Sequence, residues 1–424
     1  MTAPPQLAAG PWYTRLHWQI MIAMATGGTL AMVVGEPAVP WVGWLGTVFI
    51  RLLRMIIVPL VLTSIISGVA SVGGGRSLGR LGIKTLAYYI TTSLLAILVG
   101  LVLVNIIQPG ARSDPRTAET AGAESVAVQQ LETPQGISDV LERLIPTNPV
   151  AAAANGEMLG LIFFAILVGV TLTRLPPQPG ATLRGIVDSS FELMMVLATG
   201  IIRLAPLGVL GLITTAVAGK ELADFQPLLW YILTVALGLS FHLLITLPLL
   251  LLLVGRINPR IHFRNMADAL LTAFSTSSSA ATLPVTIHGV EKKAGVSNRV
   301  TSFVLPMGAT INMDGTALLE CVAVMFMAQV LGFGLDIPTQ FIVVLTALLA
   351  SIGAAAIPSA GLVIIFIITE AINMRGPEVV LLVGTLLAID RPLDMFRTMV
   401  NVFSDSCGAA IIARSEGETG VDVS

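Results

Sequence analysis

The polar side chains of residues 390–405 are the strongest candidates for a binding site. Placed on an α-helix at about 100° per residue, they share an arc of about 100°. The members of this face are Asp390, Asp394, Arg397, Thr398, Asn401 and Asp405. Carboxylate and amide oxygens can hold cations, and a guanidinium can hold a carboxylate. On a soluble helix such a face costs nothing. In a membrane each charge costs roughly 2.5–3.5 kcal/mol, so there the face would mark a substrate or ion site.

Two residues of this face have the complementary charges that an amino acid requires. Arg397 can grip a planar carboxylate through two hydrogen bonds with a fixed charge. Asp394 can accept hydrogen bonds from an ammonium group, and the neutral Thr398 and Asn401 can orient the rest. The pair predicts an acidic amino acid as ligand. The alternative is an internal ion pair between Asp394 and Arg397 that supports a helix bundle.

The composition places the chain in a membrane. Of its 424 residues 55% are hydrophobic and 11% charged, whereas soluble domains carry about 25% charged residues. The mean hydropathy is +0.88, and the net charge of −2 gives no indication of a nucleic-acid partner. Cys321 and Cys407 lie in apolar segments without CxxC spacing, which favours small buried residues. The first apolar run has no clear cleavage site after it and predicts a retained helix.

Several apolar runs reach the length that crosses a bilayer, ~20 residues. They cover about 18–35, 41–72, 82–107, 157–173, 184–218 and 227–255. Basic residues gather between the second and third runs, between the fourth and fifth, and after the sixth. Placing these and both termini in the cytoplasm satisfies the positive-inside rule. The polar residues 109–149 then form a solvated outer loop, and the tail from Ser415 is expected to be disordered.

After residue 255 small and polar residues interrupt the apolar segments at 275–284, 308–316 and 351–361. The segments beside the first and third breaks are about half a bilayer long, so each pair predicts a re-entrant helical hairpin. The middle break lies within one long span and predicts an unwound helix. Non-helical backbone at membrane depth is tolerated only where protein covers it or it lines a wet cavity. Paired interrupted segments therefore point to a transporter's midplane site.

The breaks also contain candidate ligands. Hydroxyls at the tip of the first hairpin, Ser277, Ser278 and Ser279, adjoin the N–H groups of a half-helix, which favour anions. The alternative is a flexible serine linker, which fits poorly between two apolar arms. Asn312 and Asp314 in the middle break add oxygen atoms to those of the 390–405 face, and hard oxygen ligands suit hard cations.

Together these stretches resemble the glutamate transporter family, the dicarboxylate/amino acid:cation symporters. The resemblance covers residues 15–414 and rests on 277–284, 312–316, 356–361 and 390–405, with weaker echoes at 55–60 and 88–93. It implies an all-α polytopic membrane protein with eight transmembrane helices, two re-entrant helical hairpins and inverted repeats. A scaffold would comprise 1–80 and 151–220, and a transport domain 81–108 and 221–414. Residues 109–150 would be an extracellular loop and 415–424 a cytoplasmic tail.

The resemblance also implies roles for single residues. Arg397 would bind the side-chain carboxylate of the substrate, Asp394 its amine, and the region of Ser279 its α-carboxylate. The full substrate set is Ser278, Ser279, Met313, Thr316, Ile357, Gly361, Asp394, Arg397, Thr398 and Asn401. One sodium site would use Asp405 and Asn401 with carbonyls of Gly308 and Asn312, and a second Asn312, Asp314, Tyr89, Thr92 and Ser93. A third would use carbonyls near Thr310, Ser351, Ile352 and Ala354.

Some positions raise questions of their own. Glu320 lies about one turn after the middle break and is a candidate proton carrier, because the matching glutamate has that role in some family members. The family usually places an arginine where this chain has Ser277 or Met395. Arg391 lies one helical turn from Asp394 and is a candidate for the same space. The histidines His17, His242, His262 and His288 are scattered and are interpreted as structural.

The resulting prediction is a secondary active symporter of aspartate or glutamate, coupled to transported sodium ions, with a proton as a second candidate coupling ion, and without an organic cofactor. It is not an enzyme. The resemblance implies an elevator movement, a homotrimer and a multi-pass place in the inner membrane of a prokaryotic cell. Alternatives are a symporter of neutral amino acids or C4-dicarboxylates, and a glutamate-gated anion channel. The sequence has no GxGD or HExxH of a protease and no phosphate loop of a primary pump.

Overall fold

The computed structural model describes residues 16–71, 76–112, 145–219, 226–353 and 360–422, and the regular elements in these ranges are all helical. The first half holds α1 (Leu16–Val34), α2 (Val39–Ser71), α3 (Arg76–Ile107), α6 (Pro149–Asn155), α7 (Met158–Leu172), α8 (Pro177–Ile202) and α9 (Ala205–Val217). The second holds α10 (Gln226–Phe241), η5 (His242–Thr246), α11 (Leu247–Leu250), η6 (Leu251–Gly255), α12 (Pro259–Thr276), α13 (Ser279–His288), η7 (Gly289–Lys293), α14 (Asn298–Ile311), α15 (Asp314–Val330), α16 (Ile337–Gly353), α17 (Ala360–Ala371) and α18 (Pro377–Ser415).

Five helical stretches within the described residues are long and apolar enough to cross a membrane, and this supports a multi-pass membrane protein. They are Glu36–Ala70, Arg80–Ile107, Pro177–Ile202, Gln226–Gly255 and Asn298–Val330. The long apolar run over 184–218 is divided in the structure, because α8 ends at Ile202 and α9 begins at Ala205. Pro206 in the first turn of α9 has no N–H to continue the preceding helix, so the chain turns there.

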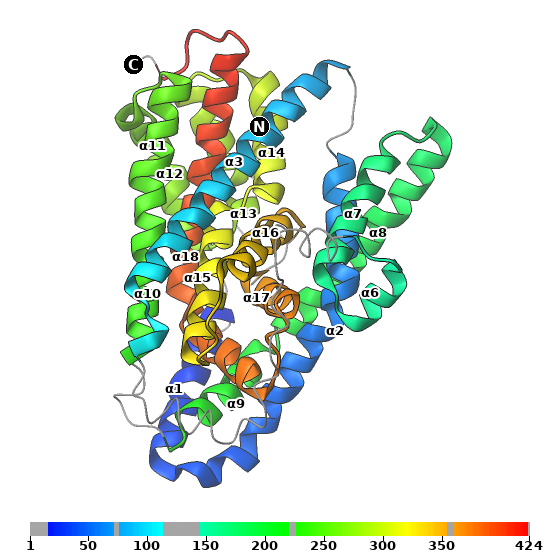
Figure 1. The fold of residues 1–424 in the computed structure, drawn as a ribbon. Coiled ribbons are helices and arrows are strands. Elements are labelled where there is room, and N and C mark those ends of the chain that lie inside the picture. Colours follow the sequence, from blue (N-terminus) through cyan, green and yellow to red (C-terminus); the bar gives the residue numbers. More distant parts are fainter. Residues whose placement is uncertain (1–15, 72–75, 113–144, 220–225, 354–359, 423–424) are drawn as a thin grey trace, which may run out of the picture.

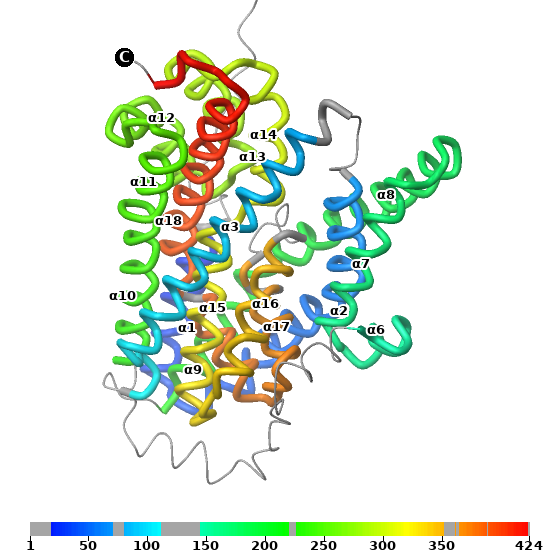
Figure 2. The backbone as a smooth tube through the Cα atoms, turned by 45° about the horizontal axis from the view of Figure 1, so that its top comes forward, coloured from blue at the N-terminus to red at the C-terminus, as the bar shows by residue number. Residues whose placement is uncertain are grey.

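The helices form two neighbouring groups (Figures 1 and 2). In one, α2 packs against α7, α8 and α9, and α9 also packs against α1. In the other, α15 packs against α3, α10 and α18. Nearly every residue of α15 is buried, so this helix is the centre of the second group and the face of α18 lies against it.

The breaks that the sequence predicts lie in this second group. Helices α12 and α13 meet at Ser277, with φ of 51°, and at the extended Ser278. The Ser278 hydroxyl accepts a hydrogen bond from the N–H of Ala281 and so caps α13. The interruption between α14 and α15 is confirmed, since Asn312 (ψ 103°) and Met313 (ψ 51°) are not helical. Residues 354–359, between α16 and α17, lie outside the described residues, as do 113–144 of the predicted outer loop.

The tail that follows α18 is ordered to Asp422, so the expectation of disorder is wrong for these residues. The Asp422 carboxylate lies 2.7 Å from His262 Nδ1 and accepts a 2.7 Å hydrogen bond from the Asn265 amide. Val421 beside it is 1% exposed. The polar tail thus contributes one buried apolar side chain, Val421, and one acidic side chain, Asp422, which packs against His262 and Asn265 of α12.

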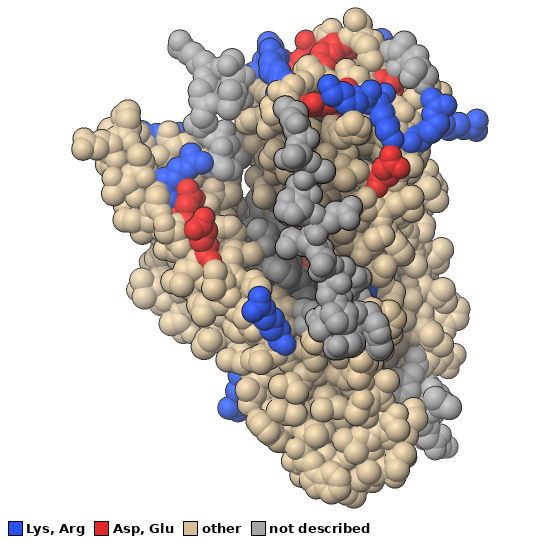
Figure 3. Space-filling view, turned by 180° about the vertical axis from the view of Figure 1, so that it is seen from behind, with Lys and Arg blue, Asp and Glu red and all other residues tan. Residues whose placement is uncertain are grey.

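Charged side chains gather at the end of the molecule where this tail lies, whereas most of the remaining surface in this view is uncharged (Figure 3). Glu416 is the centre of one cluster there. Its carboxylate lies 2.6 Å from both Lys84 Nζ and Arg80 Nη2, and 2.8 Å from Arg299 Nη2. The hydrogen bonds from Lys84 and then Arg80 lower the pKa of Glu416 to about 2. The cluster joins the end of α18 to the first turns of α3 and α14.

Replacement of Glu416 by glutamine is expected to lower the apparent melting temperature of the detergent-solubilised protein at pH 7. A carboxyl whose pKa is depressed by folding stabilises the fold above its unfolded pKa, near 4.5, and this contribution disappears as the pH falls toward about 2. The difference between the two proteins should therefore shrink between pH 4.5 and pH 2. Glu378→Gln, in an exposed residue at the other end of α18, is the control. A pH-independent difference would contradict the electrostatic explanation.

Candidate functional site

The polar face of α18 is turned into the protein, as the helical angles predict. Asp394, Arg397, Thr398, Asn401 and Asp405 are all buried, the most exposed of them at 7%. Asp390 and Arg391 are only half-buried. Buried charges and amides require partners, so their contacts define what the site can bind.

Two arginines of α18, Arg391 and Arg397, both contact Asp394. Arg397 lies 2.8 Å from Asp394 Oδ1 through both Nε and Nη2, and Arg391 Nη1 donates to Oδ2 at 3.1 Å. The internal ion pair weighed from the sequence is therefore present. Arg397 Nη1, however, is buried and has no hydrogen-bond partner among the described residues. An unsatisfied buried donor costs about 1–3 kcal/mol, more when it is charged, so Nη1 is suited to an anionic ligand.

Beside Nη1 lie a glycine and a second unpaired group. A Cβ atom on Gly361 would be 3.0 Å from Arg397 Nη1 and 3.8 Å from Glu320 Oε1. Within the part of the chain that the structure describes, both carboxyl oxygens of the buried Glu320 lack hydrogen-bond partners. The glycine thus leaves the guanidinium and the carboxyl accessible to one another and to a small ligand. Ile357, predicted to line the same place, lies outside the described residues.

Asn401 connects this face to the unwound segment. Its Oδ1 accepts a 2.8 Å hydrogen bond from the N–H of Gly315, which has no partner within the first turn of α15. Its Nδ2 lies 3.2 Å from both Thr316 Oγ1 and Met313 Sδ. The structure therefore brings together Met313, Thr316 and Asn401, three of the predicted substrate residues.

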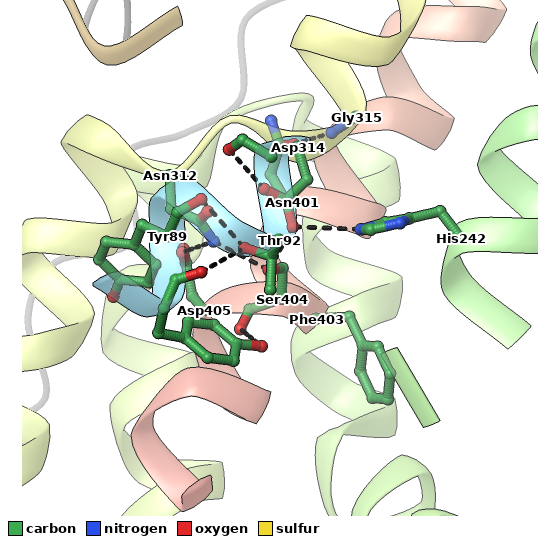
Figure 4. Close-up of polar contacts among 12 residues, drawn as sticks. Tyr89, Thr92, His242, Asn312, Asp314, Gly315, Asn401, Phe403, Ser404 and Asp405 are labelled. Carbon is green, nitrogen blue, oxygen red and sulfur yellow. Dashed lines mark hydrogen bonds and ion pairs between the residues drawn. The ribbon is translucent and has the colours of Figure 1, made fainter. Parts of the chain in front are cut away.

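A continuous hydrogen-bond network links the predicted cation ligands (Figure 4). Asn312 Nδ2 donates to Asp405 Oδ1 at 2.9 Å and to Ser404 Oγ at 3.0 Å. The hydroxyls of Ser404 and Ser93 donate to opposite oxygens of Asp314, at 2.6 and 2.7 Å. The buried Asn312 Oδ1 has no hydrogen-bond partner in the described ranges. Carboxylate, amide and hydroxyl oxygens gathered in this way form a donor set that suits a hard cation such as sodium.

The close approach of Asp405 to α14 depends on Gly308. A Cβ atom there would overlap Asp405 Oδ1 and lie 2.6 Å from the Tyr89 hydroxyl. Tyr89 in turn donates a 2.8 Å hydrogen bond to the carbonyl of Val304. The absence of a side chain at Gly308 is therefore what lets a carboxylate and a phenol reach the backbone of this helix.

Two members of the network were not identified from the sequence. His242 Nε2 lies 3.1 Å from Asp314 Oδ2, and both side chains are fully buried. It begins the π-helical segment η5, a distortion that is frequent at functional sites. Its occurrence inside an apolar span was the available signal. For Ser404 the signal was its helical angle of about 320°, next to the edge of the polar arc of α18 at Arg397.

The side chains of other predicted ligands form hydrogen bonds with backbone carbonyls of their own helices. Thr310 Oγ1 bonds to the carbonyls of Pro306 and Met307, and Ser351 Oγ to that of Leu348. Thr92 likewise bonds to its own helix, at Tyr88 and Tyr89. With Ala354 outside the described residues, the third sodium site stays a prediction. In the described part of the chain, no group of three or more His, Cys, Asp or Glu side chains forms a metal centre.

Comparison with known proteins identifies a family of similar transporters. The model of the Sodium:dicarboxylate symporter family matches residues 16–415. A "Proton/glutamate-aspartate symporter" of Escherichia coli (strain K12) is 33% identical over 95% of this chain and 93% of its own length. An "Excitatory amino acid transporter" of Caenorhabditis elegans is 35% identical over 88% and 81%. A human "Neutral amino acid transporter B(0)" is 37% identical over 91% and 75%.

These matches confirm the family that the motifs indicated. They extend over nearly the whole chain and include the broken helices and the polar face of α18. The relatives are transporters of amino acids by name, and none of those above is an enzyme. The chain therefore belongs to the sodium:dicarboxylate symporter family, the family of the glutamate transporters, and is a membrane transporter.

Proposed function

We propose that the protein is a cation-coupled symporter of acidic amino acids. The observation that carries the proposal is the buried Arg397, whose Nη1 has no partner while its other nitrogens hold Asp394. The substrate carboxylate binds Nη1, and its ammonium group binds Asp394. Thr316 and Asn401 lie beside them and orient the substrate. The α-carboxylate is bound at the tip of the α12–α13 hairpin, where Ser278 and Ser279 begin a helix.

Cations bind at the network around Asp314 and Asp405. In the described part of the chain, the carboxylates at membrane depth outnumber the cationic partners beside them, Arg391 and Arg397 at Asp394 and the His242 ring at Asp314. We therefore expect positive charge to accompany the substrate. The unpaired Asn312 Oδ1 supports a sodium ligand at this place. Each net positive charge moved inward down 100 mV contributes about 2.3 kcal/mol, enough for about fortyfold accumulation of substrate.

Transport proceeds as an elevator movement. The group of helices around α15 carries the site, and the group around α2 is the scaffold against which it moves. With the α12–α13 and α16–α17 hairpins counted as re-entrant, the remaining spans form eight transmembrane helices. The protein is a homotrimer in the inner membrane, with both termini in the cytoplasm. Helix packing is more extensive within each group than between the two, and this supports the division.

Uptake of radiolabelled aspartate into proteoliposomes tests the function. Sodium and proton gradients are imposed separately, and unlabelled aspartate, serine and succinate compete for uptake. The proposal expects sodium-dependent uptake that aspartate inhibits best. Inhibition mainly by serine or succinate would assign the neutral or C4-dicarboxylate alternative. Glutamate-gated current without accumulation would indicate a channel, and uptake without any sodium requirement would remove the cation assignments.

Glu320 is the proposed proton carrier, because its buried carboxyl has no hydrogen-bond partner and lies near Arg397. Glu320→Gln keeps the shape and removes the ionisable group. Its uptake is expected to lose the response to an imposed proton gradient and to keep the sodium requirement. A variant with the proton response of the original protein would show that another group carries the proton.

A further inference from the structure

The carboxylate proposed to receive the substrate's amine already holds two cations of its own helix. Arg397 uses two nitrogens on Asp394 Oδ1, each at 2.8 Å. Arg391 uses Nη1 on Oδ2, at 3.1 Å. Each carboxylate oxygen offers about two acceptor positions, so Oδ1 is saturated and Oδ2 is half used. An arriving ammonium group must bind at Oδ2, beside the guanidinium of Arg391, and two positive charges on one oxygen repel each other.

The two arginines differ in how firmly they are held. The side chain of Arg397 is 6% exposed, whereas that of Arg391 is 29% exposed. Arg391 has one hydrogen bond to Asp394, longer than either contact of Arg397. An exposed guanidinium recovers hydration when it leaves a carboxylate, and a buried one does not. Arg391 is therefore the partner that Asp394 can release.

The charges around the site indicate in which state of the protein Asp394 needs Arg391. The carboxyl groups of the site are Asp314, Glu320, Asp390, Asp394 and Asp405, and its guanidinium groups are Arg391 and Arg397. When substrate is bound, its ammonium supplies the positive charge beside Asp394. When the site is empty, Arg397 and Arg391 supply it. Without Arg391, Oδ2 of a buried carboxylate would lack its counter-charge in the empty protein only.

We propose that Arg391 is a tethered counter-cation that takes the place of the substrate's ammonium on Asp394 in the empty transporter. Arg391 is a positioning residue, and this proposal rests on the proposed function. Arg391 competes with substrate for Oδ2 during binding, and it neutralises Asp394 while the empty site returns across the membrane. The residue therefore weakens substrate affinity and accelerates net transport.

The test compares two modes of transport in proteoliposomes. Net uptake requires the empty protein to return, whereas exchange, with saturating aspartate on both sides, does not. Arg391→Gln is expected to slow net uptake about fivefold, the effect of losing one partly exposed ion pair. Its exchange rate should stay within about twofold, and the aspartate concentration for half-maximal exchange should fall. Arg391→Lys, which keeps the charge, should restore most of the net uptake.

Arg184→Gln is the matched control, because it removes an exposed arginine that pairs with Asp188 away from the site. Equal loss of both modes in Arg391→Gln, or net uptake equal to that of the original protein, would overturn the proposal. Arg391→Lys with the defect of Arg391→Gln would also overturn it. If the original protein itself moves no aspartate, the proposed function fails instead. Melting curves in detergent confirm that each variant is folded before transport is compared.

Discussion

Replacement of Arg397 by glutamine is expected to weaken aspartate binding by about 30-fold to several thousandfold. Truncating one partner of a buried, hydrogen-bonded charge pair costs about 2–5 kcal/mol, which corresponds to that range of dissociation constants. The variant loses the nitrogen that has no internal partner, while Asp394 keeps its hydrogen bond to Arg391. The measurement is inhibition of sodium-dependent uptake by increasing aspartate and, separately, by serine.

The selectivity of this variant separates a substrate role from a structural one. If Arg397 reads the substrate's side-chain carboxylate, Arg397→Gln should lose preference for aspartate over serine. If it only supports the helix bundle, affinity for both should change together. Arg397→Lys retains the charge without the planar fork and should be intermediate. Arg375→Gln, which removes an exposed arginine paired with Glu370, serves as the control.

Replacement of Gly308 by alanine is expected to raise the sodium concentration for half-maximal uptake by about five- to 150-fold. The new Cβ would overlap Asp405 Oδ1 and lie 2.6 Å from the Tyr89 hydroxyl. Such overpacking costs about 1–3 kcal/mol, and the range follows from that energy. The strain falls on a carboxylate of the cation network, so sodium dependence should change more than the affinity for aspartate at saturating sodium.

Two other glycines control for the added methyl group. Gly185 and Gly200 lie within α8, and a Cβ at either has no neighbour within 4 Å. Alanine at these positions should stabilise the protein slightly, by about 0.4–1 kcal/mol, or leave it unchanged. Sodium dependence in Gly308→Ala equal to that of these controls would show that Asp405 is not a cation ligand.

Periodicity was sufficient to predict the buried polar face because its residues lie on one long helix. Asp394, Arg397 and Asn401 repeat at helical spacing in α18, and burial follows directly from their shared arc. The interruption at Asn312 could be predicted for a different reason. Small and polar residues interrupt the apolar span there and predict non-helical backbone. Such backbone is tolerated at membrane depth only where protein covers it or it lines a wet cavity, so it is expected to lie against other polar groups of the protein.

Periodicity and polar interruptions could not predict features that depend on contacts between distant segments. The pairing of His242 with Asp314 joins two helices far apart in the sequence, and nothing local to either residue specifies it. The order of the tail depends on His262 in the same way. Hydropathy alone does not locate the turn after Ile202, because the run is uniformly hydrophobic; the local signal for it is Pro206 at the start of α9.

The docked tail has a practical consequence for recombinant work on this protein. Val421 and Asp422 are buried, so a purification handle fused directly after Ser424 begins close to a packed structural element. Removal of residues 421–424 would take the Asp422 carboxylate away from His262 and Asn265. Low yield of such a shortened protein would then reflect a damaged fold and would say nothing about transport. A handle at the amino end leaves this contact intact.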